Sequence, residues 1–255
     1  IISLNVNGVR SASTKGFLPW LARQKADVVC MQEIKANEAD LPDPILKPAK
    51  LSAHFHSAAK KGYSGVGLYC RQVPDRIATG IGSQEFDPEG RYLQADFGNL
   101  SIVSVYVPSG SSSEERQQAK FRFLDEFLPV LKRLRASGRE LILCGDWNIA
   151  HKEVALKNWR SNQKNSGFLP EERAWLTKVF DELGWVDVFR RVDQRAEQYT
   201  WWSNRGESWA KNVGWRLDYQ IATPAVAATA RKVAIYTTRR FSDHAPLTID
   251  YEWKL

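Results

Sequence analysis

The sequence predicts a mixed α/β fold in which two β-sheets pack against each other inside a cover of helices. Three observations lead to this prediction. Short apolar runs typical of buried strands recur along the 255 residues, amphipathic helical segments lie between some of them, and no linker rich in Pro, Gly or Ser divides the chain. Because a chain of this length can bury one large core, we expect residues 1–255 to form a single domain.

The first half of the chain is expected to supply strands and one short helix. Alternating or continuous apolar runs predict strands over residues 1–6, 28–31, 67–71, 91–97 and 101–107, and a helix is expected around residues 16–25. Glycine-containing turns separate the strands in the middle of the chain.

A long amphipathic helix is predicted next. Ser112 and Glu115 have the spacing of a capping box at its N-terminus, and Gly138 supplies a stop. Its apolar face repeats at Phe121, Leu124, Phe127, Leu131 and Leu134. Pro129 lies inside this pattern and predicts a kink or a restart, because proline lacks the N–H group that a helix interior uses.

The remaining chain contains one more helix and returns to strands. A strand is expected over residues 141–144 and a helix over residues 170–183, with Pro170 in its first turn. Further strands are expected over residues 217–222, 233–237 and 247–252.

Short polar clusters directly follow apolar runs at five places. They are Asn5-Val6-Asn7-Gly8, Gln32-Glu33, Asp146-Trp147-Asn148, Arg216-Leu217-Asp218 and Ser242-Asp243-His244. An apolar run that ends in a carboxylate or an amide is typical of a buried strand that delivers a polar group to its carboxyl end. Together these clusters carry the functional groups of a phosphoester hydrolase that uses a hard metal ion.

Glu33 and the Asp146 cluster are the candidates for metal and water chemistry. Phosphodiester hydrolysis needs a Lewis acid, a group that orients or deprotonates water, and donors for the growing negative charge. Mg²⁺ prefers oxygen ligands, which makes Glu33 the best first ligand. Asp146 could take a proton from the attacking water while Asn148 donates to a phosphoryl oxygen. A strand-end salt bridge and an Asx-turn are the structural alternatives for the two sites.

His244 is the candidate for phosphate binding. Asp243 adjoins it as a potential metal ligand, and Asp218 is available to pair with its ring. Such a pair fixes the tautomer and favours the imidazolium, which can bind an anionic phosphate. The other histidines, His54, His56 and His151, are expected to be structural.

Charge favours a polyanionic partner. The chain has a net charge of +7 and a pI of about 9.3. Residues 190–240 contain ten Lys/Arg against four Asp/Glu and also hold Trp201, Trp202, Trp209 and Trp215. The alternative is a solvated basic face above core tryptophans.

Cysteine usage and hydropathy bear on the compartment. Cys30, Cys70 and Cys144 lie in apolar runs, so we expect buried, reduced thiols and a cytoplasmic location with the DNA. No apolar stretch is long enough to span a bilayer, and the opening strand leaves no room for a signal peptide, so no membrane partner is expected.

Several motifs resemble those of the exonuclease III family of apurinic/apyrimidinic endonucleases, in order and spacing across nearly the whole chain. They are Leu4-Asn5-Val6-Asn7-Gly8, Met31-Gln32-Glu33-Ile34-Lys35, Tyr106-Val107-Pro108, residues 145–151, residues 212–219 and Ser242-Asp243-His244-Ala245-Pro246. Residues 157–168 also resemble that family's DNA-contacting loop.

The resemblance implies an activity and a set of partners. It implies a four-layered α/β sandwich that hydrolyses the phosphodiester 5′ to an abasic site with Mg²⁺, or with Mn²⁺ in its place, and leaves a 3′-hydroxyl. It further implies 3′-phosphodiesterase, 3′-phosphatase or 3′–5′ exonuclease activity. The expected partner is double-stranded DNA with abasic sites or blocked 3′ ends, bound by a monomer.

The resemblance also assigns roles to residues. Glu33 would hold the metal with Asn7 and Asp243, while Asp146 would act on water, Asn148 on phosphate, and Tyr106 beside the scissile phosphate. Asp218 would support His244. Phosphate or DNA contacts would come from Asn5, Asn148, Asn158, Asn162, Lys164, Asn165 and Arg216. The abasic pocket would be lined by Trp201, Trp215 and Leu217.

This chain departs from the family pattern at three places. Asn7 stands where some members have aspartate, and Ser109 stands where others have Asn or Gln. Ser111-Ser112-Ser113 lacks the bulky basic residue that some relatives insert into DNA. Two alternative functions remain: a phosphodiesterase of the same architecture acting on other DNA or on inositol phosphates, and a non-catalytic DNA-binding protein.

Overall fold

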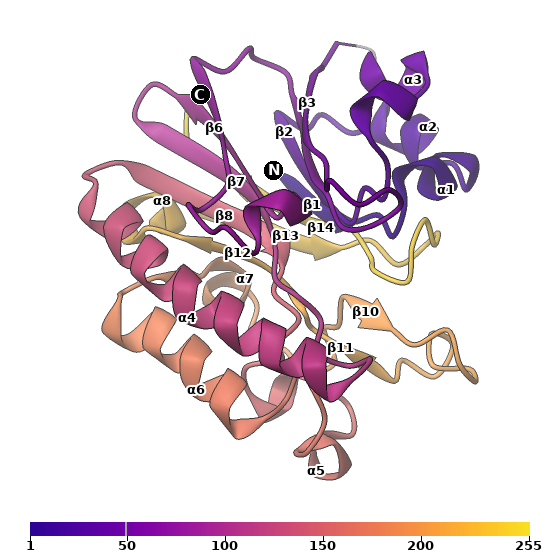
Figure 1. Ribbon diagram of the computed structural model, residues 1–255, viewed down its shortest axis with the longest axis vertical. Helices are drawn as coiled ribbons and strands as arrows, with labels where there is room; N and C mark the ends of the chain where they lie inside the picture. The colour runs from indigo at the N-terminus through magenta and orange to yellow at the C-terminus, as the bar shows by residue number, and fades with distance from the viewer. Residues whose placement is uncertain (49) are drawn as a thin grey trace.

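The computed structural model describes residues 1–48 and 50–255. Two mixed six-stranded sheets pack face to face, and helices cover the outer face of each one (Figure 1). In Figure 1 the indigo helices α1 (Val9–Thr14), α2 (Phe17–Leu21) and α3 (Asp43–Leu46) lie on one side of the molecule. The long helix α4 (Glu114–Ala136) and α6 (Pro170–Thr177) lie on the opposite side. The architecture therefore has four layers.

The first sheet joins the two ends of the described chain. In spatial order its strands are β13 (Ala230–Ile235), β14 (Leu247–Tyr251), β1 (Ile2–Asn5), β2 (Val28–Gln32), β4 (Val66–Cys70) and β3 (Ser52–His56). β1 is parallel to β2, and the other neighbours are antiparallel.

The second sheet comes from the middle of the chain. Its order is β5 (Arg76–Thr79), β6 (Tyr92–Phe97), β7 (Leu100–Tyr106), β8 (Glu140–Asp146), β12 (Asp218–Ala222) and β9 (Val186–Asp187). β7 is parallel to β8. A two-stranded ribbon of β10 (Trp201–Trp202) and β11 (Gly214–Trp215) stands apart from both sheets. Short helices α5 (Trp159–Asn162), α7 (Val188–Val192) and α8 (Pro224–Ala228) complete the fold.

Burial explains why these segments form strands. The facing sides of the sheets bury Val28, Leu68, Ile102, Ile142 and Ile249 in one apolar cluster. Since β1, β2, β4 and β7 are buried along their whole length, they read as continuous apolar runs in the sequence. Separate clusters seat the helices: Phe17 and Trp20 pack on the first sheet, and Phe123 and Phe127 of α4 pack on the second.

Strand register places the polar clusters at one level. Tyr106 at the end of β7 pairs with Asp146 at the end of β8, and Asp218 at the start of β12 pairs with Asp146 from the other side. In the first sheet Asn5 pairs with Gln32. The carboxyl ends of β1, β2, β7 and β8 therefore bring their polar residues to the same edge of the sandwich.

Three expectations about helices need correction. The cap of α4 is Ser113 and not Ser112: its side chain accepts a hydrogen bond from the backbone N–H of Arg116. Pro129 does not restart the helix, which runs from Glu114 to Ala136. The helix expected around residues 16–25 is shorter, α2 at Phe17–Leu21, and an unexpected helix, α1 at Val9–Thr14, precedes it; Gly16 in a left-handed conformation separates the two.

Two edge strands, β3 and β5, lack an apolar alternation strong enough to predict them. β3 is only half-buried along its length and β5 is largely exposed. The predicted helix over residues 170–183 consists of α6 and a π-turn at Lys178–Glu182. Cys30, Cys70 and Cys144 are free and buried as expected. Among the described residues, no helix has both the length and the apolar character to cross a membrane.

Candidate active site

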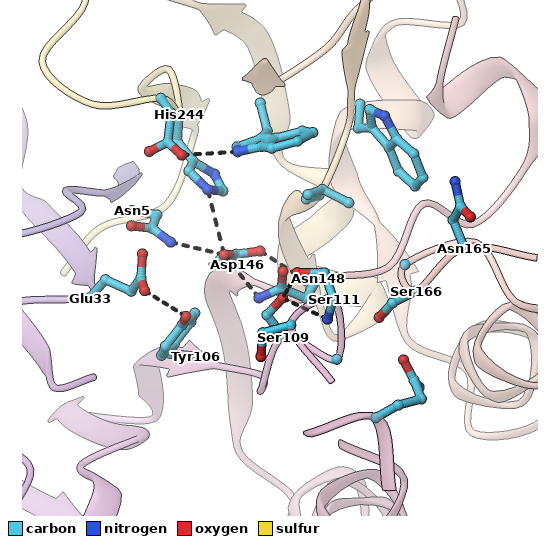
Figure 2. A pocket seen from close by; sticks show the side chains of 18 of the residues that line it. Asn5, Glu33, Tyr106, Ser109, Ser111, Asp146, Asn148, Asn165, Ser166 and His244 are labelled. Carbon is cyan, nitrogen blue, oxygen red and sulfur yellow. Dashed lines mark hydrogen bonds and ion pairs between the residues drawn. The ribbon is translucent and has the colours of Figure 1, made fainter. Parts of the chain in front are cut away.

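The polar clusters surround one cavity of about 930 Å³ at the shared edge of the two sheets (Figure 2). Its lining includes Asn5, Asn7, Glu33, Tyr106, Asp146, Asn148, Asp243 and His244. These residues come from both sheets and from chain segments more than 200 residues apart, such as Asn7 and Asp243 with a sequence separation of 236. The fold therefore brings these eight predicted residues together at one cavity.

Asp146 is the most connected residue of the cavity. Its Oδ2 accepts a hydrogen bond from Asn5 Nδ2 at 2.9 Å and another from Asn148 Nδ2 at 3.1 Å, and its Oδ1 accepts one from the Asn148 N–H at 2.9 Å. The Nε2 atom of His244 lies 3.7 Å from Oδ2. Figure 2 shows these contacts converging on Asp146 from both sheets.

His244 lies between two carboxylates. Its Nδ1 is 2.8 Å from Oδ2 of Asp218, and its Nε2 faces Asp146. Both Asp218 and His244 are buried. The second Asp218 oxygen, Oδ1, is buried and has no hydrogen-bond partner among the described residues, so its charge is compensated mainly through the imidazole.

Burial and charge set the protonation of this pair. Burial alone lowers the pKa of His244, but the charges of Asp218 and Asp146 outweigh it and raise that pKa well above its usual value. Burial raises the pKa of Asp146, and the His244 charge acts in the opposite direction. At neutral pH His244 is therefore an imidazolium whose positive charge faces the cavity.

Glu33 and Tyr106 form the other polar pair of the floor. The Tyr106 hydroxyl donates to Oε1 of Glu33 at 2.8 Å. Burial, and then the Glu33 charge, raise the pKa of Tyr106 well above its usual value, so the phenol stays protonated. Arg91 stacks on the other side of this ring, with its guanidinium carbon 4.8 Å from the ring centroid.

Lys35, Asn7 and Asp243 extend the contacts of Glu33. The Lys35 Nζ lies 3.4 Å from Oε1 of Glu33 and donates to Oδ1 of Asn7 at 2.6 Å. The Nδ2 of Asn7 donates to Oδ1 of Asp243 at 2.9 Å. Burial raises the pKa of Asp243, but His244 and the donors Asn7, Trp201 and Ser242 lower it overall, so this group is a carboxylate.

The Glu33 end of the cavity suits a hard divalent cation. Glu33, Asp243 and Asn7 offer carboxylate and amide oxygens there, which Mg²⁺ prefers, beside the Lys35 ammonium group and the Tyr106 hydroxyl. The Oε2 atom of Glu33 has no hydrogen-bond partner among the described residues, and Glu33 lines the cavity, so one carboxylate oxygen is available for a ligand. Asp146, Asp218 and His244 form a second cluster with ligand atoms within 4.8 Å of one another. In this cluster the imidazole is bonded to Asp218 through Nδ1 and carries a positive charge, which repels a metal ion, so Glu33 fits a resident cation better.

An apolar wall closes one side of the cavity. Trp201, Trp215 and Leu217 line it, and the two indole rings meet edge to face with centroids 6.4 Å apart. Phe168 supports Trp215 from behind at a centroid distance of 6.4 Å. The structure thus brings the predicted pocket residues together beside the polar floor.

Some of the residues predicted to contact DNA lie at the cavity, and others do not. Lys164 and Asn165 are exposed on the cavity rim. Asn158 and Asn162 lie outside the cavity at the two ends of α5, where Nδ2 of Asn162 donates to the Asn158 carbonyl at 2.7 Å. The expected phosphate contact of Arg216 is wrong: its side chain is buried, pairs with Asp187 at 2.6 Å, and stacks 4.2 Å from the ring centroid of Tyr219.

The buried ion pair of Lys120 and Glu172 beneath the cavity was not predicted from the sequence. Nζ of Lys120 donates to Oε1 of Glu172 at 2.6 Å and to the Asn148 carbonyl at 2.7 Å. Oε2 of Glu172 accepts from the N–H groups of Gly167 and Leu169. Lys120 lies one helical turn before Phe123 and Leu124 on the apolar face of α4. A cation at an apolar position of this face was the one sequence feature that indicated a buried ion pair.

The fold and this donor set define a class of enzyme. Residues 2–244 match the endonuclease/exonuclease/phosphatase family, and the chain belongs to this family of metal-dependent nucleases.

Individual relatives narrow the class. The chain is 36% identical over 251 residues to an exodeoxyribonuclease of Bacillus subtilis, covering 98% of each chain. It is 37% identical over 252 residues to the DNA repair nuclease APEX1 of Danio rerio, covering 98% of this chain and 81% of the relative. The solved structure of an AP endonuclease from Archaeoglobus fulgidus superposes with a TM-score of 0.90 at 26% identity, covering 99% of this chain and 98% of that one. The chain is thus a phosphodiester hydrolase of the exonuclease III and AP endonuclease type, which confirms the resemblance and the four-layered fold.

Proposed function

We propose that the protein incises duplex DNA on the 5′ side of abasic sites, using Mg²⁺ and leaving a 3′-hydroxyl. The observation that carries this proposal is the apolar wall of Trp201, Trp215 and Leu217 directly beside the Asp146–His244 floor in one cavity. A deoxyribose without its base can enter such a pocket, whereas a nucleotide that keeps its base is too large. The relatives named as a DNA repair nuclease and as an AP endonuclease support it.

We assign the general base to Asp146. Three groups could take a proton from water: Asp146, Tyr106 and His244. Tyr106 is held as a neutral phenol and His244 as a cation, so neither accepts a proton at neutral pH. Asp146 is an acceptor whose pKa is raised by burial toward the operating range, as a general base requires.

The other residues bind and orient the substrate. His244 presents its positive charge to the scissile phosphate while Asp218 fixes its tautomer. Both amide hydrogens of Asn148 are engaged, by Val107 and by Asp146, so a phosphate contact exchanges one of these bonds for a bond to the substrate. Glu33, with Asn7 and Asp243 nearby, would hold Mg²⁺, which would supply Lewis acidity for the negative charge of the phosphate.

The DNA backbone lies across the rim in this proposal. Lys164 and Asn165 contact phosphates on one side, and Asn158 and Asn162 extend the surface beyond the cavity. Asn5 acts indirectly, because its amide is bound to Asp146. The partner is double-stranded DNA with abasic sites or blocked 3′ ends, the protein acts as a monomer, and residues 1–255 form one catalytic domain.

Replacing Asp146 by Asn tests the chemistry. The amide keeps the shape of the side chain but cannot accept the proton, so nicking of a 5′-labelled duplex with one abasic site should fall by at least about a hundredfold in Mg²⁺. A chelator should abolish wild-type cleavage, and polymerase extension of the nick should show a 3′-hydroxyl. A folded Asn variant that nicks at the wild-type rate contradicts the assigned base.

Processing of 3′ ends is the second candidate activity. The Ser109–Ser113 wall of the cavity carries only hydroxyl groups and Gly110, which leaves room for a recessed end, and one relative is named an exodeoxyribonuclease. Duplexes with a 3′-phosphate or a matched recessed end, and free inositol phosphates, belong on the same assay. Faster turnover of inositol phosphates than of abasic duplex overturns the DNA assignment.

A further inference from the structure

We propose that Trp201 is a positioning residue whose indole N–H sets the orientation of the Asp243 carboxylate. Through Asp243 it also fixes the amide of Asn7 and the ammonium group of Lys35 beside Glu33. The inference rests on the proposed function and deepens it, because it couples the wall of the abasic pocket to the metal end of the cavity.

The contacts of Asp243 are the first step. Its Oδ2 accepts from Nε1 of Trp201 at 3.1 Å. Its Oδ1 accepts from Asn7 at 2.9 Å and from the Ser242 hydroxyl at 3.0 Å. With donors on both oxygens, the carboxylate cannot rotate about its side-chain axis without breaking hydrogen bonds. Among the described residues, Trp201 is the donor to Oδ2, so the indole determines which way that oxygen points.

The Asn7 amide connects the Asp243 carboxylate to the Lys35 ammonium group. A carboxylate can only accept and an ammonium group can only donate, so Asn7 must turn Nδ2 toward Asp243 and Oδ1 toward Lys35. The corresponding distances are 2.9 and 2.6 Å. If Asp243 turned away, Nδ2 of Asn7 would lose its acceptor, and only the bond from Lys35 would hold the amide in place.

Lys35 completes the chain of contacts. Its Nζ lies 2.6 Å from Asn7 and 3.4 Å from Oε1 of Glu33, so Asn7 holds the ammonium group at the margin of the carboxylate. Released from Asn7, this cation would settle on Glu33 and compete there with a divalent ion. Trp201 thereby keeps Oε2 of Glu33 available for the metal.

Packing alone does not require an indole at this position. The wall function of Trp201 needs aromatic area, which a phenylalanine also provides, whereas the bond to Asp243 needs the N–H. Trp201→Phe therefore separates the two roles. Trp202→Phe is the matched control. The indole of Trp202 donates to Oδ1 of Asn212 at 3.0 Å, a residue of the loop between β10 and β11, and not to Asp243.

The test is to titrate Mn²⁺ into the full chain without DNA. The electron paramagnetic resonance signal of the free ion measures how much Mn²⁺ remains unbound. We expect Trp201→Phe to weaken Mn²⁺ binding about tenfold, the effect of losing a hydrogen bond to a charged group, and Trp202→Phe to leave it unchanged. Equal Mn²⁺ affinity in Trp201→Phe and the wild type overturns the proposal.

A double variant tests the route through Lys35. In a Lys35→Met background no ammonium group competes for Glu33, so adding Trp201→Phe should have little further effect on Mn²⁺ binding. Independent, additive effects would show that Trp201 acts by another path and would overturn the inference.

Steady-state kinetics on abasic duplex separate this role from pocket lining. Trp201→Phe should lower kcat at limiting Mg²⁺, recover at high Mg²⁺, and change KM by less than about twofold, because the aromatic wall is kept. A raised KM with unchanged kcat would assign Trp201 to the wall alone. Mn²⁺ binding needs no substrate, so it tests the role of Trp201 separately from the proposed function. If the proposed function is wrong, the wild type will bind Mn²⁺ but will not cleave abasic duplex.

Discussion

Glu33 leaves β2 with a φ of 53°, a left-handed conformation that is uncommon for a residue with a Cβ. Asn7, Lys35 and Asn148 share this feature, with φ of 42°, 51° and 51°. Each such residue costs about 1 kcal/mol or more. These four lie at strand ends around one cavity, so the strain is concentrated where side chains must turn back toward the substrate.

A single residue, His151, also makes the free energy of unfolding depend on pH in the acidic range. Burial, followed by the Lys152 charge, lowers the pKa of His151 to about 4. Between about pH 6.5 and pH 4 the unfolded chain therefore binds a proton that the folded protein refuses, and the folded state loses stability as the pH falls. His151→Gln should reduce the loss of unfolding free energy between pH 7 and pH 5 by on the order of 1 kcal/mol, after discount for partial exposure.

Urea denaturation of both proteins at the two pH values measures this difference. The glutamine keeps a polar group near Thr177, whose Oγ1 lies 2.9 Å from His151 Nε2 in the wild type. If the stability of the two proteins had the same pH dependence, His151 would not be the group responsible.

At the scale of elements, α4 reaches under the active site through Lys120. This side chain and Glu172 of α6 are completely buried, and they hold the Asn148 carbonyl and the backbone of Gly167 and Leu169. Burial lowers the pKa of Lys120, while Glu172 and then Asp146 oppose that effect. Two helices on the outer layer thus support two loops of the cavity.

Removing one partner of this pair should be costly. Lys120→Met leaves the Glu172 carboxylate buried without its cation, so we expect the unfolding free energy to fall by about 3–5 kcal/mol. Lys120→Met combined with Glu172→Gln should recover part of that loss, because no uncompensated charge remains. Urea midpoints of the single and double variants measure this, and a double variant no more stable than Lys120→Met would argue against the charge-burial explanation.

At the scale of the whole molecule, the net charge of +7 suits a polyanionic partner, and Lys164 is an exposed cation on the cavity rim, as is Arg205. Lys164→Ala should weaken binding to all duplexes and flatten the dependence of log K on log salt by about one unit, because one phosphate contact is lost. Fluorescence anisotropy in chelator, without cleavage, measures the slope.

Lys132 provides the control for this charge change. It is exposed on α4, fifteen residues beyond Gln117 of the cavity lining, or roughly 22 Å along the helix. Lys132→Ala removes the same charge and should leave the slope nearly unchanged. Equal flattening in both variants would indicate a response to net charge and not a contact.

Much of the fold could be predicted because inner strands of both sheets, such as β1, β2, β4 and β7, are buried along their whole length and form continuous apolar runs. The edge strands β3 and β5 could not, since exposure removes the apolar signal. Glu33, Asp146, Asp218 and His244 were visible as polar residues directly after such runs. Arg216 was misjudged because a sequence does not show that Asp187, 29 positions away, takes its guanidinium into the core. Lys120 was overlooked because one cation inside a helical stripe resembles a surface residue.

The pairing of β1 with β14 has a consequence for protein synthesis. Asn5 and Asn7 are translated more than 230 codons before Asp243 and His244. While the nascent polypeptide is still attached to the ribosome and its last strand is inside the exit tunnel, the cavity lacks one of its sides. We therefore expect that unfinished chains do not cut nucleic acid and that premature termination before residue 243 yields an inactive product.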